Sequence, residues 1–121
     1  MAKLGIMGFA GLSNTACGAI IGDTATGLVA TGATQVTALP LPSVSNFIGT
    51  AAAATGVILL VGSAGDTINV YNGGANALLV YPPVGGAINA LAINTGISIA
   101  TLKSAQFVYS APLTMMSILS A

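Results

Sequence analysis

The chain has 121 residues and a mass of 11.7 kDa, which leaves room for one domain with one modest hydrophobic core. Hydrophobic residues make up 55% of it, and only 3% are charged: Lys3, Asp23, Asp66 and Lys103. A free monomer normally carries about a quarter charged residues on its surface. We therefore expect much of this surface to be covered by copies of the chain, a larger assembly or lipid. The net charge is zero and no basic patch occurs, which argues against nucleic acid as a partner.

Few residues of the chain could carry out chemistry. Histidine is absent, which excludes Ser–His and Cys–His nucleophile pairs. The two aspartates have no acidic neighbours, and Asp66, directly after Gly65, is expected to accept backbone N–H bonds in a turn. Cys17 is the single cysteine, so it has no partner for an intrachain disulfide or a zinc cluster and is interpreted as a small buried residue. The sequence predicts a non-enzyme without catalytic residues, cofactor or metal.

Residues 1–32 consist mainly of Gly, Ala, Thr and short apolar pairs. Each glycine would cost about 1 kcal/mol inside a helix, so no helical period is expected here. We predict an extended arm or short edge strands that gain order from a partner chain or surface. Lys3 and the apolar run after it loosely imitate a signal peptide, but glycine and serine dilute that run, and secretion is a minor alternative.

Residues 33–121 are predicted to form the β-domain. Short runs of β-branched, aromatic and aliphatic residues recur roughly every 8–12 residues from residue 57 onward, separated by Gly, Asn and Pro. This spacing is typical of a small β-sandwich or barrel, so the sequence predicts an all-β fold of that kind. Residues 48–54 are ambiguous, because their alanine run favours a helix but Gly49 and Gly56 limit it to about two turns. The predicted strands are residues 34–39, 57–61, 67–71, 77–81, 87–93, 97–100, 106–110 and 115–119.

The strongest local pattern lies at residues 67–81. Two strand-like runs flank the sequence Asn-Gly-Gly-Ala-Asn at residues 72–76, where glycine and asparagine tolerate the positive φ angles of a tight reversal. The pattern therefore predicts a β-hairpin. Pro82 and Pro83 then end the second strand, because proline has no N–H to donate to a ladder.

Residues 47–65 raise the question of a membrane span, because their hydropathy would be flagged in a window of about 19 residues. The strongly apolar part, residues 57–61, is far shorter than the roughly 20 residues that a spanning helix needs. No Lys or Arg flanks it to anchor or orient it. We therefore expect no membrane as partner, and a small membrane protein is the least favoured alternative.

The run GDTINVYNGGANALLVYPPVGGAIN, at residues 65–89, contains a specific motif of strand and turn residues. With it, the chain resembles a family of small proteins and domains of tailed bacteriophages, and the resemblance extends over residues 33–108. The positions that match are Ala33-Thr34-Gln35, Thr55-Gly56-Val57, Gly65-Asp66, Val70-Tyr71-Asn72, Gly74-Ala75-Asn76, Leu78, Val80-Tyr81-Pro82-Pro83, Gly85-Gly86 and Ile88-Asn89.

The resemblance implies a structural virion protein on the capsid exterior. Such a decoration, or cement, protein stabilises the lattice of the major capsid protein, commonly as a homotrimer. Residues 1–32 would then lie along the capsid or be exchanged between protomers. The alternative is a head- or tail-fibre domain that binds host-surface glycans through Tyr71, Tyr81 and Tyr109, which requires these side chains to be clustered and exposed.

Overall fold

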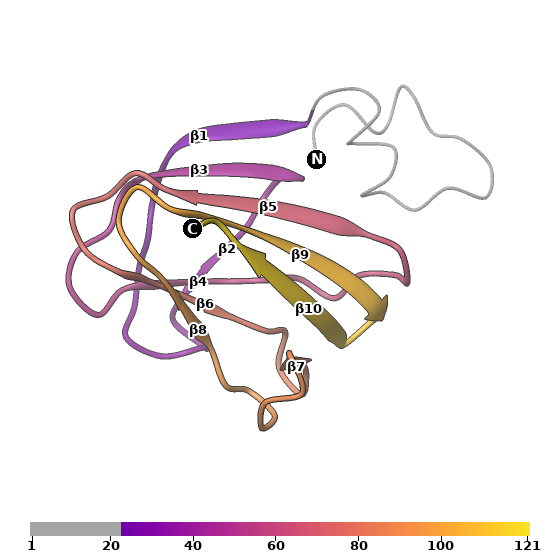
Figure 1. Ribbon diagram of the computed structural model, residues 1–121. Coiled ribbons are helices and arrows are strands. Elements are labelled where there is room, and N and C mark those ends of the chain that lie inside the picture. Colours follow the sequence, from indigo (N-terminus) through magenta and orange to yellow (C-terminus); the bar gives the residue numbers. More distant parts are fainter. Residues whose placement is uncertain (1–22) are drawn as a thin grey trace.

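The computed structural model describes residues 23–121, and this part of the chain is all-β, as predicted. A six-stranded sheet has the order β1-β3-β5-β9-β10-β7, and a four-stranded sheet has the order β2-β4-β6-β8 (Figure 1). The strands are β1 (Thr24–Val29), β2 (Leu39–Pro40), β3 (Ser45–Thr50), β4 (Gly56–Ile58), β5 (Thr67–Asn72), β6 (Leu78–Tyr81), β7 (Ala87–Ile88), β8 (Ile97–Ile99), β9 (Ser104–Ala111) and β10 (Thr114–Leu119).

Strands β1 to β6 form three parallel coils, each of which adds one strand to each sheet. In the six-stranded sheet β1, β3 and β5 pair in parallel, and in the four-stranded sheet β2, β4 and β6 do the same. The register places Ser45 beside Asn69, which lies 24 residues further along the chain. The arrangement is solenoid-like, so the predicted sandwich or barrel is wrong. The sequence suggested that successive strands are neighbours in one sheet. In the structure each turn leads from one sheet to the other, so successive strands from β1 to β6 lie in different sheets.

The predicted hairpin at residues 67–81 shows this difference. Both of its strands exist, but β5 and β6 lie in different sheets, so the loop between them is the corner of a coil. A Cβ atom on Gly74 would lie 2.5 Å from the backbone nitrogen of Ala51, in the preceding coil. Glycine is therefore required here for close packing between coils rather than for a hairpin turn.

Antiparallel strands extend both sheets, and β7 then pairs in parallel with β10 at the far edge of the six-stranded sheet. β8 pairs with β6 in the four-stranded sheet, and β9 pairs with both β5 and β10 in the six-stranded sheet. β9 alternates half-buried and buried residues over most of its length, as a strand with one face on a core does. The core includes Phe107, Val57 and Leu78, which come from three strands and have no exposed surface.

Residues 34–39 do not form the predicted half-buried strand, because threonine side chains stabilise a turn. The Thr37 N–H donates to the Thr34 carbonyl at 3.2 Å, and the two hydroxyl oxygens are 2.8 Å apart. Hydroxyls that bond to nearby backbone compete with a strand ladder. Val36 is consequently 84% exposed, and only Leu39–Pro40 remains as strand β2.

The predicted arm is described only from residue 23 onward. Thr24–Val29 forms β1, at one edge of the six-stranded sheet, which is one of the two forms expected for this region. Residues 1–22, which include Cys17 and the signal-like run, lie outside the described residues. Within residues 23–121, no helix is long and apolar enough to span a membrane.

Candidate functional site

The structure separates the three tyrosines that were expected to form one binding surface. Tyr71 on β5 belongs to the six-stranded sheet, whereas Tyr81 on β6 belongs to the four-stranded sheet, and its hydroxyl donates to the Ala33 carbonyl at 3.4 Å. Tyr109 on β9 is only 3% exposed. The three side chains therefore do not provide the clustered, exposed surface that the predicted glycan site requires.

Tyr109 instead helps to stabilise the fold. Its hydroxyl donates to the Leu60 carbonyl at 2.6 Å, and its N–H donates to the Asp66 carbonyl at 2.9 Å. Burial, and secondly the negative charge of Asp66, raise the pKa of the Tyr109 hydroxyl above its ordinary value of 10.0. The Asp66 carboxylate accepts the Ser63 N–H at 2.9 Å, which confirms the turn role predicted for it.

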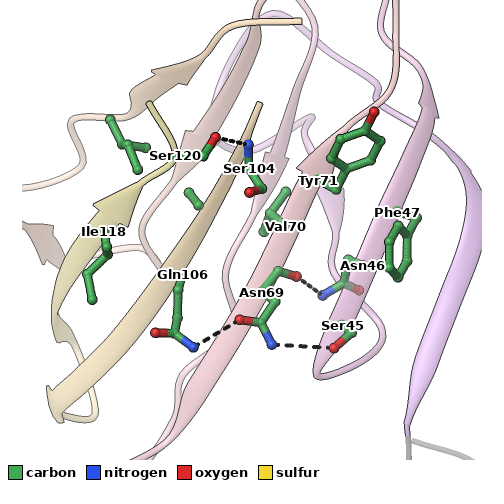
Figure 2. Close-up of a pocket in the computed structure, with 12 residues that line it drawn as sticks. Ser45, Asn46, Phe47, Asn69, Val70, Tyr71, Ser104, Gln106, Ile118 and Ser120 are labelled. Carbon is green, nitrogen blue, oxygen red and sulfur yellow. Dashed lines mark hydrogen bonds between the residues drawn. The ribbon is translucent and has the colours of Figure 1, made fainter. Parts of the chain in front are cut away.

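The most promising site is a groove on the outer face of the six-stranded sheet, across β3, β5, β9 and β10 (Figure 2). Its volume is about 560 Å³, within the range of roughly 300–1,000 Å³ typical of small-molecule sites. All the residues that line it are uncharged. The side chains that determine its chemistry are Ser45, Phe47, Asn69, Tyr71, Gln106 and Ile118.

A row of polar side chains crosses this groove. The register aligns Ser45 with Asn69 across β3 and β5, and Asn69 with Gln106 across β5 and β9. Gln106 Nε2 donates to Asn69 Oδ1 at 3.2 Å, and Asn69 Nδ2 donates to Ser45 Oγ at 3.4 Å (Figure 2). Both bonds are long for N–H···O contacts. Within residues 23–121, the Gln106 Oε1 atom accepts no hydrogen bond.

Aromatic side chains lie along one side of the polar row, and an aliphatic side chain lies at its end. The Phe47 and Tyr71 rings are 6.1 Å apart between centroids and tilted by 53°, and Phe47 is 43% exposed. Ile118 on β10, which the register places beside Gln106 at one end of the polar row, is 51% exposed (Figure 2). The Tyr71 hydroxyl makes no hydrogen bond within the described part of the chain. The groove thus combines apolar walls with neutral polar atoms that have unused bonding capacity.

Sequence reasoning selected Tyr71 but missed the other residues of the groove. Ser45, Asn69 and Gln106 are separated by 24 and 37 residues in the sequence, and only the sheet register aligns them. The alternation of polar and apolar residues along residues 67–70 was a usable signal for which side chains of that strand face outward. It contained no information about which strands are neighbours.

The described surface has almost no charge. Both aspartates are buried, with Asp23 9% and Asp66 5% exposed. Lys103 is exposed, and its Nζ donates to the Ala121 carbonyl. Among residues 23–121 no group of three His, Cys, Asp or Glu side chains could hold a metal ion. Contacts of this surface therefore depend on shape, apolar area and neutral hydrogen bonds.

Large apolar side chains are exposed away from the groove as well. Five of them are more than 60% exposed: Val36, Val61, Val84, Ile93 and Leu102. Comparison of the chain with protein-family models, curated proteins and solved structures found no match. The features that bear on function are therefore the described surface and the motif in residues 65–89.

Proposed function

We propose that the chain is a structural virion protein of a tailed bacteriophage that decorates the capsid exterior. In this role it stabilises the lattice of the major capsid protein through protein–protein contacts. The observation that supports the proposal best is the surface of residues 23–121, which combines a single exposed charged side chain, Lys103, with many exposed apolar ones. The resemblance of residues 65–89 to phage decoration and head-fibre proteins supplies the context.

The proposed mechanism depends on buried area rather than on chemistry. Removing apolar surface from water contributes about 25 cal/mol per Å², so small apolar contacts add up when they repeat over a shell. A homotrimer would present three such contacts at once, and linked contacts bind more tightly than single ones. Backbone hydrogen bonds between successive coils stiffen the chain, which suits a protein that must transmit force between neighbouring capsomers.

The β1 edge of the six-stranded sheet is consistent with assembly of the chain with a partner. Among the described strands, β1 has a neighbour on one side only, namely β3. An open edge offers unpaired N–H and C=O groups to other chains, and proteins usually cover such edges. A partner protomer or the capsid surface would cover this one.

Two measurements test the proposal. Light scattering coupled to size-exclusion chromatography, on the full chain without detergent, is expected to give a trimer. Co-sedimentation with expanded capsids of the phage that encodes the chain is expected to give saturable binding and to raise the temperature at which the capsids open. A chain that leaves both the sedimentation and the opening temperature of the capsids unchanged would contradict the proposal, whatever its oligomeric state.

A further inference from the structure

We propose that the groove on the outer face of the six-stranded sheet binds a neutral saccharide. The site differs from the tyrosine cluster expected from the sequence, because it uses Tyr71 alone of those three residues. It goes beyond the capsid role and does not depend on it, since a decoration protein and a protein with another virion position could both carry this groove.

The absence of charged side chains in the groove indicates which class of ligand it favours. None of the residues that line it is charged. Lys103 precedes the lining residue Ser104 in the chain, but Lys103 is not part of the lining, and its ammonium group donates to the Ala121 carbonyl. Phosphate, sulfate and carboxylate groups would find no cation here to offset the loss of their hydration. An uncharged ligand is therefore favoured over a nucleotide or an acidic sugar.

The polar atoms of the groove fit hydroxyl groups, which both donate and accept hydrogen bonds. An amide side chain also offers both functions, since its nitrogen has two donors and its oxygen two acceptor sites. Gln106 uses one donor on Asn69, and Asn69 uses one donor on Ser45. The Gln106 Oε1 atom and the Tyr71 hydroxyl have no partner within residues 23–121. Donors and acceptors thus alternate across neighbouring strands about 4.8 Å apart.

The aromatic wall fits the apolar C–H face of a sugar ring. Tyr71 and Phe47 lie beside the polar row, so one ligand could stack on a ring and bond to the amides at the same time (Figure 2). One edge of the Tyr71 ring lies close to Gly73, where a Cβ atom would come within 3.0 Å of its Cε2 atom, so the glycine leaves room for the ring.

A second copy of the chain is the main competing occupant. Packing of an apolar surface over this groove would bury the Gln106 Oε1 atom and the Tyr71 hydroxyl without partners, which is unfavourable. A ligand rich in hydroxyls satisfies both atoms. The polar row therefore favours a saccharide over self-association at this face.

The test starts with the full chain on an array of immobilised glycans that includes neutral structures and structures with sialic or uronic acids. The neutral glycan with the strongest signal is then titrated in solution by isothermal calorimetry. We expect Y71A and Q106A each to weaken its binding at least tenfold, and Y71F, which keeps the ring, to weaken it less. The matched control is Y81A, which removes a tyrosine from the other sheet and should leave the affinity unchanged.

Three results would overturn the proposal: no neutral glycan bound above background, binding confined to acidic glycans, or an affinity that neither Y71A nor Q106A reduces. Each variant is first compared with the wild type by circular dichroism. If Y71A is misfolded, Q106A decides, because Gln106 is half-buried on the outer face. Capsid binding by the same variants should be unchanged, so failure of the saccharide site and failure of the capsid role remain distinguishable.

Discussion

Asn69 and Asn72 lie on the same strand, β5, and present the same amide group to opposite faces of the six-stranded sheet. Asn72 is fully buried, and its side chain makes three hydrogen bonds of 2.9–3.0 Å with Asn76, Ile99 and Gly74. Asn69 is half-buried, and its side chain makes two bonds, of 3.2 and 3.4 Å. The inner amide links β5 to β8 and to the loop at residues 74–76, whereas the outer amide keeps one donor free for a partner. Polar groups on the inner face should thus control stability, and those on the outer face should control binding.

The largest effect is expected from N72A. The substitution leaves the Asn76 and Ile99 carbonyls and the Gly74 N–H without their partner in the interior, which should lower the free energy of unfolding by about 3 kcal/mol or more. Urea unfolding followed by circular dichroism measures the loss. The matched variant N69A, on the same strand, should lose less than about 1 kcal/mol, because its neighbours can bond to water. Equal losses for the two variants would refute the contrast between the faces.

A smaller loss, about 2 kcal/mol, is expected from N46A. Asn46 is 1% exposed, and its amide bonds to the N–H and carbonyl of Ser43 and to the Asn69 carbonyl. Two of these bonds stay within one short loop, so the chain can relax locally when they are removed. Urea unfolding should place N46A between N69A and N72A, and a loss above that of N72A would contradict this ranking.

Tyr109 provides a pH-dependent test of the inner face. Its pKa is raised above 10.0 in the folded protein, so the native state keeps a proton that the unfolded state releases. The stability that this group contributes is therefore fully present below pH 10 and falls as the pH rises above that value. Replacement by phenylalanine should cost about 1 kcal/mol at pH 7, because the Leu60 carbonyl loses its donor.

Unfolding of Y109F and the wild type, measured from pH 8 to pH 11.5, checks this expectation. The variant should lose less stability than the wild type over the alkaline part of the range. Tyr71 and Tyr81 are present in both proteins, so the difference reports on position 109. Parallel pH profiles would show that Tyr109 ionises as readily in the folded chain as in the unfolded one.

The smallest effect on stability is expected from Q106A. Gln106 lies half-buried on the outer face, and its one side-chain hydrogen bond, to Asn69, is 3.2 Å long. The free energy of unfolding should change by no more than about 0.5 kcal/mol. Thermal unfolding of Q106A beside N72A checks the contrast directly, and a loss comparable to that of N72A would mean that the polar row stabilises the fold.

The sequence allowed the fold class and several strands to be predicted, but not how the strands pair. The strand-like run at residues 67–71 and the breakers at Pro82 and Pro83 act locally, so they could be recognised in the sequence. The hairpin prediction failed because a glycine-rich coil corner and a hairpin loop share the same local composition. Their difference is the contact of Gly74 with Ala51, in another coil. The groove was missed for the same reason, since its polar row exists only through the parallel register of Ser45 with Asn69 and the antiparallel register of Asn69 with Gln106.

Because the strands of successive coils pair in parallel, further coils could be added to the stack without a change in its architecture. Ser45 and Asn69 occupy equivalent positions in successive coils and are 24 residues apart. One coil is therefore a segment whose last residue lies beside its first in the stack. A tandem duplication of such a unit would insert one strand into each sheet and lengthen the stack by about 4.8 Å. It would leave every existing turn intact and extend the polar row by one side chain. Gene duplication could thus alter the reach of this protein in discrete steps, as in other repeat architectures.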